Sequence, residues 1–88
     1  MDIIQIEKIL KAAANRRRLK ILRYLKDHKR VSVSELAGHI KLSFKSTSRH
    51  LAILRNTDLV ETEQVSLTIL YSLSSSAPKV LEQILSHL

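Results

Sequence analysis

Residues 43–56 read SFKSTSRHLAILRN. Thr47, Leu51 and Leu54 recur at helical spacing, so we expect a helix from Phe44 to about Asn56 that buries this stripe. Ser43 precedes it as a typical N-cap. The other faces carry hydroxyl and basic side chains, which suit a helix whose outer surface meets an anionic partner.

A shorter helix is predicted just upstream, from Val33 to about Ile40. Ser32 and Glu35 fit a capping box, in which the hydroxyl and the carboxylate satisfy end amides reciprocally. Only a tight turn at residues 41–42 separates the two helices. Residues 33–56 are therefore predicted to form a helix-turn-helix, a motif whose second helix enters a DNA major groove.

Three more helices and two strands are expected around this motif. The helices cover residues 2–14, residues 16 to about 27 with Asn15 as N-cap, and a last stretch with Pro78 in its first turn that ends near His87. Strands are expected at about 59–64 and 68–73, joined by a loose turn over 65–67 because no glycine or asparagine stands there. The predicted fold class is mainly α with a small β-wing, a single winged helix-turn-helix domain over residues 1–88.

The net charge of +7 is unevenly distributed over the 88 residues. Fourteen of the fifteen Lys and Arg residues lie between Lys8 and Arg55, where only Asp27 and Glu35 oppose them. Positive charge concentrated in one stretch of a compact domain favours a polyanion-binding face. A solvated basic surface is the alternative interpretation.

Composition excludes several kinds of activity. No cysteine is present, which removes disulfides, thiolate nucleophiles and cysteine-ligated metals. The single glycine is too few for a P-loop or a dinucleotide fingerprint. Ser46 and His50 have the spacing of a nucleophile and its base, but no orienting carboxylate or oxyanion motif accompanies them. With no apolar run of about 20 residues and no signal peptide, we expect a cytoplasmic, intracellular binding module without a cofactor or membrane partner, and not an enzyme.

Five segments in order resemble the ArsR-type winged-helix repressors: NRRRLKIL at 15–22, VSELA at 33–37, LSFKSTSRHLAIL at 42–54, DLV at 58–60 and YSL at 71–73. The similarity spans roughly residues 12–73, and SRHL at 48–51 is its most specific part. The resemblance implies a dimeric regulator of transcription that binds double-stranded DNA. It also implies that helix 44–56 is the recognition helix and residues 59–73 are the wing.

Candidate site residues follow from the helix faces and from this resemblance. The expected DNA contacts are Ser43, Phe44, Lys45, Ser46, Ser48, Arg49 and His50, and the expected phosphate contacts are Arg16, Arg17, Lys41 and Arg55. Family members dimerise through their first and last helices, here 1–14 and 77–88. The matching apolar stripes are Ile3, Ile6, Leu10, Leu81, Ile84, Leu85 and Leu88.

The sequence departs from the family pattern in three ways. Metal-sensing members place two cysteines at the start of the third helix, where this chain has Ser32 and Ser34, and its last helix offers only Glu82 and His87. We therefore expect no metal site of the family type. The wing lacks the usual basic residues and glycine and is acidic, so we expect it to add little to DNA affinity. Asp58 stands where the family usually has a glycine, between helix 44–56 and the first strand. Aspartate tolerates the left-handed conformation at some cost.

The sequence as a whole predicts a dimeric repressor that binds a palindromic operator, with two recognition helices in successive major grooves about 34 Å apart. Two alternatives stay open: a winged-helix module that docks a partner protein, and a non-specific architectural or single-strand binder. A small effector in the dimer interface is also left open.

Overall fold

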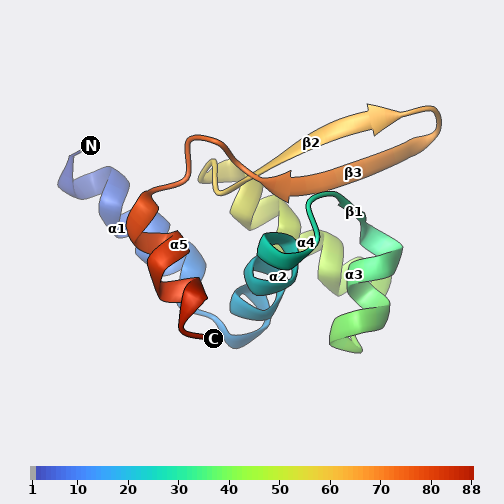
Figure 1. The fold of residues 1–88 in the computed structure, drawn as a ribbon, viewed down its shortest axis with the longest axis horizontal. Coiled ribbons are helices and arrows are strands. Elements are labelled where there is room, and N and C mark those ends of the chain that lie inside the picture. The colour runs from blue at the N-terminus through green and yellow to red at the C-terminus, as the bar shows by residue number, and fades with distance from the viewer. Residues whose placement is uncertain (1) are drawn as a thin grey trace.

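The structure is a computed structural model that describes residues 2–88. Five helices and three short strands follow one another along the chain (Figure 1). They are α1 (Ile3–Ala13), α2 (Arg16–Asp27), β1 (Val31–Ser32), α3 (Val33–Ile40), α4 (Phe44–Asn56), β2 (Val60–Val65), β3 (Thr68–Leu73) and α5 (Lys79–Ser86). The predicted winged helix-turn-helix is confirmed. None of the helices in residues 2–88 has the length and apolar character to cross a membrane.

Polar side chains begin the first four helices. Asp2, Asn15, Ser32 and Ser43 each accept a hydrogen bond from a backbone N–H two or three residues further on. These bonds satisfy amides that the helix itself leaves without a partner. α5 begins after Pro78 without a side-chain cap.

The capping box predicted at α3 is only half formed. The Ser32 hydroxyl accepts from the Glu35 N–H at 3.1 Å, but the Glu35 carboxylate instead accepts from the Tyr24 hydroxyl at 2.6 Å. This carboxylate raises the pKa of Tyr24, mainly because it accepts a hydrogen bond from the neutral phenol. The prediction failed because α2 packs against α3 and brings a phenol within reach, which local sequence does not show.

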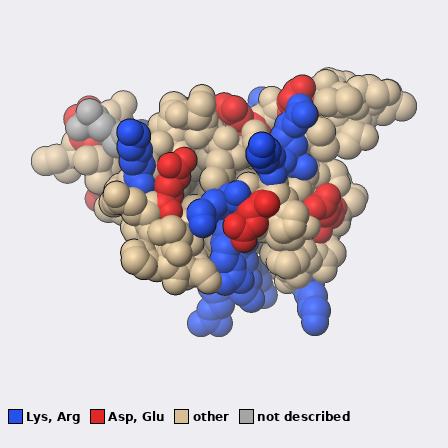
Figure 2. Space-filling view, viewed as in Figure 1, with Lys and Arg blue, Asp and Glu red and all other residues tan. Residues whose placement is uncertain are grey.

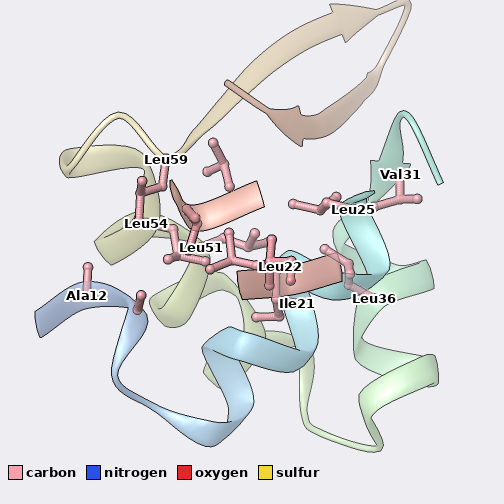
Figure 3. Packing of buried hydrophobic residues seen from close by; sticks show 13 residues of the cluster. Ala12, Ile21, Leu22, Leu25, Val31, Leu36, Leu51, Leu54 and Leu59 are labelled. Carbon is pink, nitrogen blue, oxygen red and sulfur yellow. The ribbon is translucent and has the colours of Figure 1, made fainter. Parts of the chain in front are cut away.

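The core is built almost entirely of aliphatic side chains, which come from all five helices, from β1 and from the start of the wing (Figure 3). The stripe predicted on α4, Thr47, Leu51 and Leu54, is fully buried. Leu59 follows α4 and is equally buried. Its N–H donates to the Leu54 carbonyl at 3.0 Å, and its own carbonyl accepts from the Ser74 N–H at 3.0 Å. This residue therefore anchors the base of the wing to α4.

The three strands form an antiparallel sheet in the order β1-β3-β2. β1 is two residues long, and its pairing of Val31 with Tyr71 was missed because two residues show no period-two pattern. The prediction of a loose turn in the wing is wrong, because the turn has only two residues. Val65 pairs with Thr68, so only Ser66 and Leu67 form the turn, and Ser66 adopts a positive φ of 58°. A positive φ at the first central position is typical of a tight type II′ turn, usually supplied by glycine.

Two other residues take the left-handed conformation. Asp58 has a φ of 59°, as the sequence predicts for the position between α4 and the wing. Lys41 has a φ of 56° and ends α3, which produces the tight turn before α4. In Figure 1, α1 and α5 lie at one end of the molecule and α3 at the other, and the wing projects above α3.

Candidate nucleic-acid interface

The outer surface of α4 carries the residues that the sequence predicts as DNA contacts. Phe44, Lys45 and Arg49 are exposed, as is the cap residue Ser43. Ser46, Ser48 and His50 are half-buried, between this exposed face and the core-facing stripe. This part of the helix therefore presents the cations Lys45 and Arg49 and several short hydroxyl groups, a set of groups that can approach phosphates and base edges.

Phe44 faces solvent and does not pack under the turn, since 60% of its surface is exposed. It borders a hollow of about 400 Å³ that lies between the first turns of α4 and α3 and the tip of the wing. Ser48 lines the same hollow from α4, and Leu67 and Ile69 line it from the wing. The wing tip and the first half of α4 thus belong to one continuous surface.

The four predicted phosphate contacts are all exposed: Arg16, Arg17, Lys41 and Arg55. Figure 2 shows Lys and Arg side chains projecting from the lower edge of the molecule, the edge below α2 and α3 in Figure 1. Two basic residues of α2, Lys20 and Arg23, were not among the predicted phosphate contacts. Lys20 and Arg23 of α2 line a hollow of about 280 Å³ with His39 and Lys41 of α3, and their i,i+3 spacing on the polar face of α2 was the available signal.

Arg18 differs from its two neighbours because it is half-buried. Its Nε donates to the carbonyl of Ala12, and its Nη2 donates to the carbonyl of Lys11 at 3.4 Å. Its Nη1 lies 3.4 Å from Nδ1 of His50 on α4. One guanidinium thus joins the end of α1 to the middle of α4.

His50 has a pKa below the ordinary value of a histidine. The principal cause is burial of the ring, and the positive charges of Arg18 and Arg17 add to it. The ring is therefore neutral at physiological pH. A neutral imidazole has one N–H donor and one acceptor nitrogen, so its hydrogen-bond partners decide which nitrogen carries the proton.

The wing offers no basic side chain between residues 59 and 73. One of its carboxylates, Glu63, pairs with Arg30 at 2.5 Å between Nη1 and Oε2, whereas Glu61 is exposed. Leu67 at the tip is 95% exposed. The tip is thus apolar and uncharged, and the acidic residues lie nearer the base of the hairpin.

The predicted dimer residues separate into two groups. Ile3, Ile6 and Leu10 of α1 are exposed, as are Ile84 of α5 and Leu88 beyond its end. The three α1 side chains line an apolar hollow together with Glu7, Lys11 and Ala14. In contrast, Leu81 and Leu85 are only 5% and 1% exposed and pack in the core of this chain.

No group of three or more His, Asp or Glu side chains within residues 2–88 is arranged to hold a metal ion. Ser32 caps α3 and Ser34 lies in its first turn, and neither supplies a soft ligand. Glu82 lies in α5 and His87 at its end.

Comparison with known proteins identifies the family. The sequence model described as "Bacterial regulatory protein, arsR family" matches residues 15–62, which include α2, the helix-turn-helix and the start of the wing. The chain belongs to the ArsR family of transcriptional regulators. Its similarity extends beyond that segment: it is 44% identical over 80 residues to the transcriptional activator HlyU of Vibrio cholerae, covering 91% of this chain and 73% of HlyU.

Solved structures of ArsR-like regulators have the same fold. A structure of Vibrio cholerae HlyU matches with a TM-score of 0.84 and 39% identity, covering 96% of this chain and 94% of that one. The homodimeric winged helix-turn-helix DNA-binding domain of Mb0332 from Mycobacterium bovis matches with a TM-score of 0.81 and 25% identity, over 97% and 75% of the two chains. The transcriptional repressor PagR of Bacillus anthracis matches with a TM-score of 0.82 and 27% identity, over 97% and 93%.

Proposed function

We propose that this ArsR-family regulator is a homodimer that binds a palindromic operator through α4 and represses transcription. The main support for the proposal is the set of exposed cations on the outer face of α4. Lys45 and Arg49 are exposed there, with the exposed cations Arg16 and Arg17 at the start of α2. Lys45 and Arg49 can reach base edges, and Arg16 and Arg17 suit phosphates. Together they provide the two kinds of contact that operator recognition requires.

Dimerisation is supported by the apolar surface of α1. Ile3 is 85% exposed, and Ile6 and Leu10 extend the same stripe. A small domain buries a limited core on its own, so sharing these side chains with a second copy adds stabilising contacts. The homodimeric state of the Mb0332 domain supports the same arrangement.

The regulatory sense of the protein is proposed to be repression. PagR is a repressor, whereas HlyU is an activator, so relatives of both kinds share this fold. The likeness to the repressor PagR over 97% of this chain supports repression. We further propose that binding is independent of thiolate metal ligands, because the chain has no cysteine.

Selection of bound sequences from a random duplex pool tests the proposal. We expect enrichment of an inverted repeat whose half-sites lie about one helical turn apart. Retention of DNA without an enriched sequence would indicate an architectural binder. No retention even at low salt would contradict the proposal and favour a protein-interaction module.

Two substitutions then assign the contacts. Arg49→Ala is expected to lower the preference for the selected operator over random duplex, because it removes a base-edge contact. Arg17→Ala is expected to weaken both duplexes by a similar factor and to reduce the salt dependence by about one unit of slope, because it removes a phosphate contact. If both variants bind like the parent, α4 is not the recognition helix.

A further inference from the structure

Arg18 of α2 and His50 of α4 form a contact between these two helices. The guanidinium is fixed from behind, because the carbonyls of Lys11 and Ala12 at the end of α1 accept hydrogen bonds from it. Its remaining N–H groups face Nδ1 of His50 at 3.4 Å from Nη1. The side chain is half-buried, so this arrangement is part of the packing between α1, α2 and α4.

This contact determines the tautomer of His50. A guanidinium only donates hydrogen bonds, so Nδ1 must be the acceptor and carries no proton. The ring is neutral, because burial and the charges of Arg18 and Arg17 lower its pKa. The single ring proton is therefore on Nε2.

Nε2 of His50 is not fully buried. It has no hydrogen-bond partner among residues 2–88, and no buried side-chain nitrogen or oxygen in that part of the chain lacks a partner. An unpartnered Nε2 must therefore be accessible, although the ring as a whole is half-buried. His50 follows Arg49 on α4 and lies at i,i+4 from Ser46, next to the surface assigned above to DNA.

We propose that Arg18 is a positioning residue that locks His50 in the Nε2–H tautomer, so that α4 presents one fixed N–H donor to an acceptor atom of bound DNA. The proposal rests on DNA binding through α4. Two kinds of acceptor atom fit this donor. One is a base-edge atom in the major groove, such as a purine N7, and the other is a phosphate oxygen. The guanidinium stays behind the ring and does not touch the DNA.

The tautomer is tested without DNA, by long-range proton–nitrogen NMR of the full chain. The parent is expected to show His50 in the Nε2–H form. In Arg18→Lys and Arg18→Gln the two tautomers are expected to mix, because neither side chain reproduces the fork that holds Nδ1 as acceptor. Finding the Nδ1–H form in the parent would overturn the proposal, as would finding the Nε2–H form unchanged in both variants.

The donor is tested with a matched pair of substitutions. Glutamine places an amide N–H near the position of Nε2, whereas asparagine reaches only as far as Nδ1. His50→Gln is expected to bind the selected operator within about threefold of the parent, and His50→Asn to bind about tenfold more weakly. Circular dichroism of both variants checks that the fold is kept. Equal binding by the parent and both variants would overturn the proposal.

Chemically modified duplexes show whether the acceptor atom belongs to a base or to a phosphate. If it is a purine N7, replacing that base by its 7-deaza analogue abolishes the difference between His50→Gln and His50→Asn. If it is a phosphate, a neutral methylphosphonate at one position abolishes it. Failure of the parent to bind any duplex would contradict the proposed function but would not change the tautomer measured by NMR. Failure of DNA binding can therefore be distinguished from failure of the tautomer proposal.

Discussion

The hydroxyl of Thr47 donates a hydrogen bond to the carbonyl of Ser43 at 2.8 Å, one turn earlier in α4. The Thr47 side chain is fully buried. The same carbonyl also accepts from the Thr47 N–H at 3.0 Å, so it has a partner without the hydroxyl. The methyl group of Thr47 therefore contributes packing, and the hydroxyl can be removed without leaving a buried acceptor unpaired.

This relationship predicts different effects of two substitutions. Thr47→Val keeps the volume and should change the free energy of unfolding by less than about 1 kcal/mol. Thr47→Ser removes the buried methyl group and should cost about 1 kcal/mol or more. Urea unfolding measures both values. A larger loss in Thr47→Val than in Thr47→Ser would show that the hydroxyl is the stabilising group.

The turn of the wing provides a second prediction. Ser66 has a φ of 58°, a conformation that costs a serine energy and a glycine none. Ser66→Gly should therefore stabilise the protein by about 0.5 kcal/mol, since relief of this cost exceeds the entropy gained by the unfolded chain.

Leu67→Gly is the control for that substitution. Leu67 does not have a positive φ and is almost fully exposed, so the glycine there adds only unfolded-state entropy and should lower stability. Thermal unfolding of both variants decides the matter. Stabilisation by Leu67→Gly, or loss of stability in Ser66→Gly, would be inconsistent with this turn geometry.

Much of this architecture could be predicted from local sequence, and the failures have a common cause. The bounds of α2, α3 and α4 follow from apolar spacing and from caps such as Asn15 and Ser43, which act within one turn. β1 and the Tyr24–Glu35 bond depend on segments that meet only in the folded chain. The same holds for the site, because the exposed face of α4 follows from helical periodicity but the Arg18–His50 contact requires two helices to be packed.

The proposed dimer interface is tested by placing a charge on it. Leu10→Asp adds a carboxylate to the exposed apolar stripe of α1 and should convert the dimer to monomer at micromolar concentration, because a buried unpaired charge is costly. Leu67→Asp makes the same change at an exposed residue of the wing and should leave the dimer intact. Sedimentation velocity distinguishes the two. A parent that sediments as a monomer would contradict the proposed interface.

The lowered pKa of His50 predicts how stability depends on pH. As the pH falls below about 6.5, the unfolded chain takes up the proton on this histidine before the folded chain does. The contribution of His50 to stability is therefore full above that pH and falls as the pH falls toward the folded-state pKa. His50→Gln does not titrate at this position, so the stability of the parent relative to His50→Gln should decrease between about pH 7.5 and about pH 5. A constant difference in urea unfolding would contradict the shift.

In the proposed complex, two copies of α4 occupy successive major grooves of one operator. The most direct test inserts about 5 base pairs, half a helical turn, between the half-sites of the selected sequence. If α4 binds in this way, the two recognition helices can no longer reach their grooves on one face of the lengthened duplex. The affinity for the lengthened operator should then fall to that of a single half-site. Unchanged affinity for the lengthened operator would show that the protein does not bind as a symmetric dimer through α4.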